Sequence, residues 1–254
     1  MSTNKFDDIV ILAGARTPMA EWVGGKRGDG LNGGALASVS ALELGAAASR
    51  AALERAGVPA TRIDHVVMGN ALQTSADAIY GARHVGLKAG VSEECPALTV
   101  NRLCGSGLQS VATAAQLLQL GEANWVLAGG MENMSQAPHV LRGARGGLKL
   151  GPGSMLEDSL FAALKDTYCG FFMAQTSDNL ARKYGLTRAQ QDEFALRSHE
   201  RANTANTNGR FAQEISPVEV KMGKKSAVVE KDDHLFPATS IDKLAALPDR
   251  KSTR

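Results

Sequence analysis

The stretch "TVNRLCGSG", residues 99–107, marks the point where a strand is expected to turn into a helix. It joins a β-favouring run that ends at Val100 to "LQSVATAAQLLQLG" (108–121), which has the apolar spacing of a helix. Cys104, one of only three cysteines, stands where the strand turns into the helix. A helix N-terminus carries unpaired N–H groups and a partial positive charge, so a cysteine there ionises readily. Because the thiolate is the nucleophilic form of cysteine, the turn predicts a nucleophile at Cys104.

The two glycines after Cys104 fit this interpretation. Gly105 and Gly107 have no side chains, so a substrate can approach the backbone closely. The N–H groups there are placed to hold an oxyanion as it forms at a carbonyl. The alternative is a small, inert cysteine packed beside glycines, since free cysteines are among the most buried residues. The residues alone leave both interpretations open.

Strands and helices alternate through the first half of the chain, which predicts an α/β fold. Such alternation favours a mostly parallel sheet covered by helices on both faces. The expected strands are 8–14, 63–70, 96–101 and 124–130, and the expected helices are 41–57, 78–90 and 105–120.

The pattern changes after residue 130. A Gly-rich loop is expected over 143–155, followed by helices near 156–166, 172–185 and 187–207, the last with Thr187 and Gln190 as a capping box. Strands 215–222 and 226–231 then read as a hairpin around Gly223, Lys224 and Lys225. We therefore expect an α/β domain over 1–130 and a mainly helical excursion with a small hairpin over 131–240. The tail, 241–254, is expected to close with neither strand nor helix.

Composition narrows the function classes. The chain has 28 basic and 26 acidic residues and a net charge of +2, which gives no reason to expect nucleic acid as a partner. The N-terminus lacks the pattern of a signal peptide, and no apolar stretch is long enough to cross a membrane. The three cysteines show no metal-ligand spacing, so no metal is expected. These features favour a reduced compartment, the cytoplasm or an organelle matrix.

Four motifs, in order and with consistent spacing, resemble the thiolase family. They are "VILAGARTP" near the start, "NRLCGSG" at the turn, "LAGGMENMSQAPH" at 127–139 and "MAQTSDNLARKYGLTRAQQDEFA" at 173–195. The chain is most similar to the 3-ketoacyl-CoA thiolase (acetyl-CoA acyltransferase) group. The resemblance implies a thiolase-like fold: an N-terminal α/β/α layer with an inserted, mainly helical loop domain. It also implies that Cys104 takes the acyl group from a coenzyme A thioester.

The resemblance further implies a two-step acyl transfer of fatty acid metabolism, such as β-oxidation. Its substrates are 3-ketoacyl-CoA, acetyl-CoA and CoA, and it needs no bound cofactor. Family members form homodimers or tetramers, with the "NRLCGSG" motif near the interface; Arg102 is a candidate interface residue. Glu132 is expected to support the site rather than to take part in the chemistry.

Two further places are candidate substrate contacts by resemblance. Phe172 and Met173 stand where short-chain biosynthetic thiolases have a His before the Met, so Phe172 favours broader ketoacyl chains over strict acetoacetyl-CoA specificity. Ordinary packing at a helix start is the alternative. Lys224 and Lys225 occupy the hairpin tip, where the family binds the CoA nucleotide and basic side chains suit its phosphates. A solvated charge pair is the alternative.

The second α/β half of the family is not expected in these 254 residues. That half carries an Asn motif, a Gly-His-Pro motif and a Cys-x-Gly motif, whose His and Cys handle protons; the five histidines here lack the Gly-His-Pro context. We therefore expect low activity from the chain alone, and a separate C-terminal half is a possible partner. A non-catalytic remnant that binds CoA or a partner remains an alternative. A ketoacyl synthase is disfavoured, because "NRLCGSG" and "GGMENMS" suit thiolases better.

Overall fold

The computed structural model describes residues 9–23, 34–147, 156–223 and 225–247, and the chain divides into two compact units. The first unit comprises Met1–Ala137 and Glu214–Asp233, and the second comprises Pro138–Gln213 and His234–Arg254. The hairpin, which lies within 214–233, therefore belongs to the same unit as the α/β layer. The sequence pattern instead predicts that residues 131–240 form one excursion. Packing explains the difference, because Val218 and Val220 of the hairpin form a buried cluster with Leu36 and Leu44.

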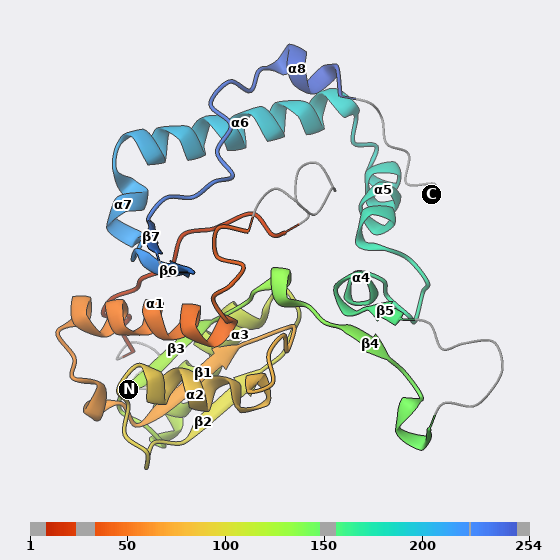
Figure 1. The fold of residues 1–254 in the computed structure, drawn as a ribbon. Helices are drawn as coiled ribbons and strands as arrows, with labels where there is room; N and C mark the ends of the chain where they lie inside the picture. Colours follow the sequence, from red (N-terminus) through yellow and green to blue (C-terminus); the bar gives the residue numbers. More distant parts are fainter. Residues whose placement is uncertain (1–8, 24–33, 148–155, 224, 248–254) are drawn as a thin grey trace, which may run out of the picture. The chain divides into compact units, whose positions relative to one another are not determined.

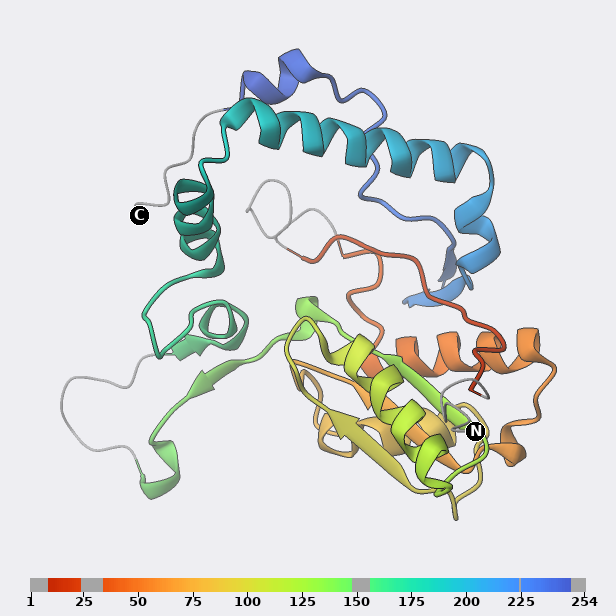
Figure 2. The same ribbon diagram turned by 180° about the vertical axis from the view of Figure 1, so that it is seen from behind.

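The first unit is built on a three-stranded parallel sheet of order β2-β1-β3. Helices α1 and α2 pack on one face of the sheet and α3 packs on the other (Figures 1 and 2). The elements are α1 (Ala41–Ala56), β1 (His65–Gly69), α2 (Gly81–Lys88), β2 (Ala97–Val100), α3 (Ser106–Leu120), β3 (Val126–Gly130), β6 (Val218–Met222) and β7 (Lys225–Val229). The predicted parallel α/β layer is thus confirmed.

The sequence explains why these elements form. Helix α1 begins where the Ser40 side chain accepts the Glu43 N–H, and it ends at Gly57, whose φ of 63° is left-handed. The central strand β1 is buried over four of its five residues, as expected for a strand covered on both faces. Leu42, Val66 and Val85 are almost fully buried and join the helices to the sheet.

The second unit is mainly helical. It contains β4 (His139–Leu141), β5 (Leu156–Asp158), α4 (Ser159–Ala163), α5 (Met173–Tyr184), α6 (Arg188–Thr207) and α8 (Ile241–Ala245), while α7 (Arg210–Glu214) ends at the division between the units. Short 3₁₀ turns in the chain are Ala60–Arg62, Ala78–Tyr80, Met134–Gln136 and Ala144–Gly146. The predicted capping box of α6 is confirmed, since Thr187 and Gln190 exchange hydrogen bonds.

Two expectations for the excursion and the tail are wrong in part. The helix expected from 156 begins only at Ser159, because 156–158 pair with β4 and the Asp158 carboxylate accepts the Leu160 N–H at 2.9 Å. The tail contains α8, which Ser240 caps by accepting the Lys243 N–H. Of the loop expected over 143–155, residues 148–155 lie outside the described part.

The strand expected over 8–14 is not formed in its described residues, 9–14. Val10 and Ile11 are 70% and 82% exposed. The isolated β-bridge that follows this segment joins Arg16 to Ile215. Arg16 is held there by a bidentate ion pair with Asp232, at 2.8 and 2.9 Å. An apolar run forms a strand only where a neighbouring strand takes up its N–H and C=O groups, and the described β3 has β1 as its one neighbour.

Candidate active site at the amino end of helix α3

Cys104 lies where the sequence predicts it, between the end of β2 at Val100 and the start of α3 at Ser106. Its side chain is exposed, so the alternative of a buried packing cysteine is wrong. The preceding residue, Leu103, has a φ of +48°, a left-handed conformation that L-residues other than glycine rarely adopt. The N-cap of α3 is Gly105, which contributes no side-chain cap to the first helical N–H groups.

Two glycines of the sheet bring the start of α3 against the backbone of the strands. A Cβ at Gly69, the last residue of β1, would lie 2.5 Å from the Ser106 backbone carbon. A Cβ at Gly130, the last residue of β3, would lie 3.4 Å from the Gly107 Cα. The close approach therefore depends on Gly69, whereas a Cβ at Gly130 would make an ordinary van der Waals contact. A Cβ at Gly107 itself would meet nothing within 4 Å.

Side chains of the turn fix its shape. The Ser106 hydroxyl accepts the Arg102 N–H at 2.8 Å and donates to the Leu103 carbonyl at 2.6 Å. The side-chain amide oxygen of Asn101, Oδ1, accepts the Leu103 N–H at 2.9 Å. One helical turn further on, Ser110 is fully buried and its hydroxyl lies 2.7 Å from the Gly129 carbonyl oxygen, which ties α3 to β3.

Glu132, just beyond β3, supports the loop that follows β1. Its carboxylate accepts the Ala71 N–H at 2.9 Å, the Leu72 N–H at 3.0 Å and the Asn70 side-chain amide at 3.1 Å. Burial raises the pKa of the Glu132 carboxyl above its usual value, while these donors act in the opposite direction. The supporting role expected for Glu132 agrees with these contacts.

The raised pKa of Glu132 predicts a pH-dependent stability. A carboxyl whose pKa is raised by folding contributes most below its unfolded pKa, and that contribution is lost as the pH rises through the folded pKa. We expect the free energy of unfolding of the wild type, relative to that of Glu132→Gln, to increase as the pH falls from about 7 to about 5, so that the wild type becomes relatively more stable. Urea unfolding of both proteins at the two pH values measures this. A difference that is constant, or that grows with rising pH, would contradict the prediction.

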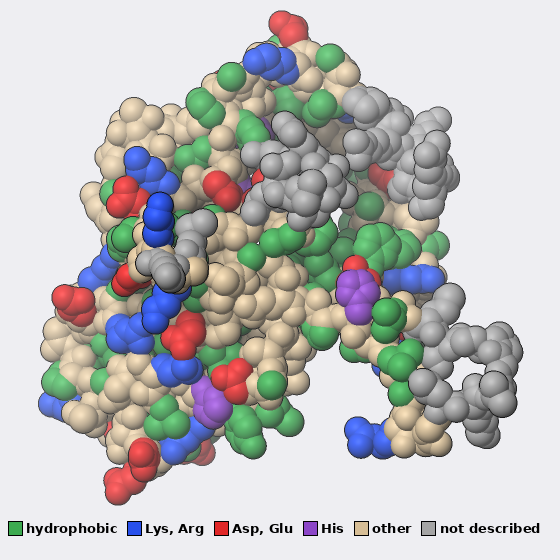
Figure 3. Space-filling view, in the orientation of Figure 1, with side chains coloured by type: hydrophobic (Ala, Val, Ile, Leu, Met, Phe, Trp, Pro, Cys, Tyr) green, Lys and Arg blue, Asp and Glu red, His purple; other side chains and the backbone are tan. Residues whose placement is uncertain are grey.

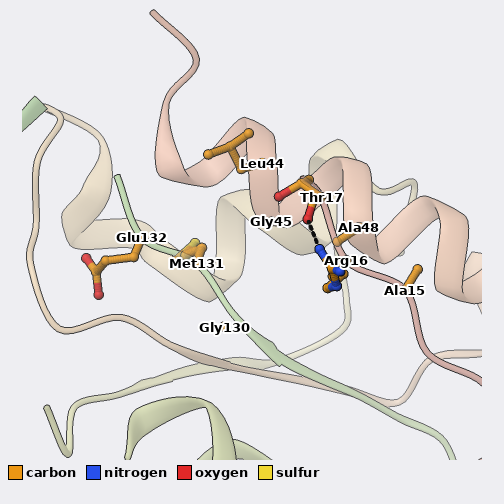
Figure 4. Close-up of a pocket in the computed structure, with 9 residues that line it drawn as sticks. All are labelled: Ala15, Arg16, Thr17, Leu44, Gly45, Ala48, Gly130, Met131 and Glu132. Carbon is orange, nitrogen blue, oxygen red and sulfur yellow. Dashed lines mark hydrogen bonds between the residues drawn. The ribbon is translucent and has the colours of Figure 1, made fainter. Parts of the chain in front are cut away.

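A small hollow lies beside Glu132. It holds about 150 Å³ and is lined by Ala15, Arg16, Thr17, Leu44, Gly45, Ala48, Gly130, Met131 and Glu132. Figure 4 shows Arg16 and Thr17 of the N-terminal segment over helix α1, with Met131 and Glu132 on the strand end opposite. The Glu132 carboxylate points away from Arg16, toward its partners in the loop after β1.

Phe172 and Met173 lie in the second unit, at the start of α5. The Phe172 ring meets the Phe161 ring edge-on, with 5.4 Å between centroids, and its backbone N–H is accepted by the Gln175 side chain. Met173 is 61% exposed. These contacts fit local packing for Phe172 and leave Met173 at the surface, so the role of both in substrate binding stays a prediction.

Lys225 is the first residue of β7 and is exposed, opposite Met222 in the hairpin ladder. Lys224 lies outside the described residues. The predicted hairpin is confirmed, with a turn tighter than expected because Lys225 already belongs to the strand. Arg102 donates to the Gln109 side chain at 2.7 Å, which orients it along the first turn of α3.

Sequence reasoning missed Gly69 and Asn101 as parts of the site. Gly69 ends a buried strand, and a glycine there signals close backbone approach. Asn101 precedes the turn, where short amide side chains commonly hold the backbone. Both signals are present in the printed sequence.

Within 9–23, 34–147, 156–223 and 225–247, no group of three or more His, Cys, Asp or Glu residues is placed to hold a metal ion. In the same ranges, no helix is both long and apolar enough to cross a membrane.

The first unit is therefore an α/β layer with an exposed cysteine on the turn between a strand and a helix. The family model for the thiolase N-terminal domain matches residues 9–251. Human mitochondrial 3-ketoacyl-CoA thiolase is 43% identical over 240 residues, which is 94% of this chain and 58% of that protein. The acetyl-CoA acetyltransferase of Cupriavidus necator is 39% identical over 241 residues, with the same coverage.

Solved structures agree with these sequence matches. The crystal structure of human mitochondrial 3-ketoacyl-CoA thiolase superposes with a TM-score of 0.84, covering 93% of this chain and 57% of that one. The Bacillus anthracis acetyl-CoA acetyltransferase also gives a TM-score of 0.84, at 35% identity, covering 94% and 57%. The chain belongs to the thiolase family, corresponds to its N-terminal domain, and spans a little under three fifths of its relatives' length.

Proposed function

We propose that this chain carries the acyl-accepting half of a thiolase reaction, with Cys104 as the residue that takes the acyl group. The observation that supports this most strongly is the exposed thiol at the amino end of α3, in a thiolase N-terminal domain. The N–H groups of the first turn of α3 and its partial positive charge favour a thiolate and an adjacent oxyanion.

In the degradative direction the Cys104 sulfur attacks the keto carbon of a 3-ketoacyl-CoA. The bond between the keto carbon and the carbon next to the thioester carbonyl breaks. The latter carbon takes a proton, and acetyl-CoA leaves. The thiolate of free CoA then attacks the acyl-cysteine carbonyl, a new thioester forms, and the Cys104–acyl bond breaks. The proton transfers in both steps need an acid/base group. In the family this work is done by residues of the second α/β half.

Substrate contacts beyond Cys104 are part of the proposal. In this proposal Lys224 and Lys225 bind phosphates of CoA. Phe172 and Met173 contribute to the acyl-chain specificity, which extends to ketoacyl groups longer than acetoacetyl. One relative of known structure is the human mitochondrial 3-ketoacyl-CoA thiolase in complex with CoA, which supports CoA thioesters as the ligand class. We further propose a role in fatty acid breakdown, a homodimeric or tetrameric assembly, and a cytoplasmic location.

Release of CoA from an acyl-CoA tests the proposed function without requiring turnover. The wild-type chain is expected to release up to one equivalent of CoA per chain, as the acyl group moves from the CoA sulfur to Cys104. Chromatography quantifies the CoA released. Cys104→Ser is expected to release none above the blank, whereas Cys169→Ser, which removes the other exposed thiol, is expected to behave like the wild type. No release above the blank from the wild type would favour a non-catalytic CoA-binding domain, and equal release above the blank from all three proteins would show that Cys104 is not the acceptor.

A further inference from the structure

The described residues behind the nucleophile turn form a continuous series of hydrogen bonds that begins at Glu132 and ends at Leu103. We propose that Glu132 and Asn101 are positioning residues for Cys104: they hold the strained turn so that the thiol stays at the amino end of α3. The inference deepens the proposed function and rests on it for the purpose of the turn. The series itself lies entirely within the first unit.

The first link joins the end of β3 to the loop after β1. Glu132 accepts the consecutive N–H groups of Ala71 and Leu72, one on each carboxylate oxygen. A single side chain thus fixes the direction of the peptide at Ala71. Because the carboxylate is half-buried, its hydrogen bonds are stronger than the same contacts would be in water.

The second link joins that loop to the turn. The Asn101 side-chain amide donates to the Ala71 carbonyl at 3.2 Å, and its carbonyl oxygen accepts the Leu103 N–H at 2.9 Å. The Asn101 side chain therefore links the backbone of Ala71 to the backbone of Leu103. Only a side chain with a donor and an acceptor at this spacing makes both contacts.

Leu103 explains why the turn needs this support. A left-handed conformation is unfavourable for an ordinary L-residue, because its Cβ comes too close to the following carbonyl oxygen. Leu103 is also 64% exposed, so its side chain contributes little packing to offset that cost. If the turn relaxes, Cys104 moves away from the amino end of α3, and the field of the helix falls off quickly with distance from that end.

Two near-isosteric variants break the series at different links. In Glu132→Gln, an NH₂ group replaces one of the two carboxylate oxygens. The N–H of either Ala71 or Leu72 then faces a donor instead of an acceptor. In Asn101→Asp, the contact with Leu103 is retained, but a carboxylate oxygen faces the Ala71 carbonyl oxygen. The matched control is Glu122→Gln, which removes the same charge at the far end of α3.

The three cysteines supply the readout. Limiting iodoacetamide followed by peptide mass spectrometry gives the alkylation rate of Cys104 relative to exposed Cys169, while buried Cys95 reports unfolding. Each variant is expected to lower the Cys104 to Cys169 ratio about 2- to 10-fold, the effect of one lost hydrogen bond, with Cys95 still protected. Glu122→Gln is expected to leave the ratio unchanged.

The double variant tests whether the two residues act through one path. Because both act on Ala71, the double variant is expected to be within about twofold of the more affected single variant. Multiplied effects, or an unchanged ratio in either single variant, would overturn the proposal. Asn101 is exposed, so if Glu132→Gln unfolds and exposes Cys95, the result for Asn101→Asp decides alone.

Failure of the proposed function gives a different result. If Cys104 is never acylated by an acyl-CoA, the acyl-transfer proposal fails whatever the alkylation rates are. If acylation occurs but neither variant changes the alkylation ratio, the proposed function stands and the positioning role is wrong.

Discussion

Thiolysis of a 3-ketoacyl-CoA by this 254-residue chain alone is expected to run at least about 10²- to 10⁴-fold more slowly than by a full-length thiolase relative. This difference in rate is what a single general acid or base typically contributes to catalysis. The resemblance to thiolases implies that the His and second Cys that handle protons belong to the second α/β half, and this chain covers 58% of the human mitochondrial relative. The losses need not multiply, since catalytic residues that act as a unit are not additive.

Adding the C-terminal part of a thiolase relative as a separate polypeptide is expected to raise the rate. We expect this polypeptide to cover exposed apolar side chains of the first unit, such as Leu108 and Leu120 of α3, which are 78% and 73% exposed. Figure 3, which views the molecule from the side opposite α3, also shows hydrophobic side chains at the surface. A spectrophotometric thiolysis assay measures the rate, with Cys104→Ser plus the same polypeptide as the control. Turnover by the chain alone that matches a full-length relative, and that Cys104→Ser removes, would show that these residues include a base.

Gly69→Ala is expected to destabilise the first unit by about 1–3 kcal/mol, the range for overpacking in a packed interior. The new Cβ would lie 2.5 Å from the Ser106 backbone, which cannot turn aside as a flexible side chain can. The start of α3 must therefore move away from β1, and the alkylation rate of Cys104 is expected to fall with it.

Gly107→Ala is the matched control for this substitution. Gly107 lies in the first turn of α3, its Cβ would meet nothing within 4 Å, and alanine favours a helix over glycine by up to about 1 kcal/mol. Urea unfolding is expected to order the proteins as Gly107→Ala, then wild type, then Gly69→Ala in falling stability. The reverse order for the two variants would show that the packing of α3 on the sheet is described wrongly.

Local rules predicted much of the fold, because the elements concerned carry their own signals. The helix over 41–57 and its stop at Gly57 follow from apolar spacing and a left-handed cap, and α6 follows from Thr187 and Gln190. The position of Cys104 was predictable for the same reason, since a strand, a turn and a helix meet within nine residues.

Features that depend on distant partners were not predictable. The run 9–14 has the composition of a strand but has no neighbouring strand among the described residues. The hairpin packs on the first unit through the buried cluster that includes Leu36 and Leu44. Likewise Glu132, Ala71 and Asn101 lie far apart in the sequence, and only the fold brings them together. Local patterns carry no information about such contacts.

The central claim, that Cys104 accepts the acyl group, is tested most directly by locating that group. The chain is incubated with an acyl-CoA, quenched in acid to preserve the thioester, digested and mapped by tandem mass spectrometry. We expect an acyl group on the peptide that carries Cys104, and we expect it to disappear when free CoA is added before the quench. An acyl group on Cys169, or none on any cysteine while CoA is released, would contradict it.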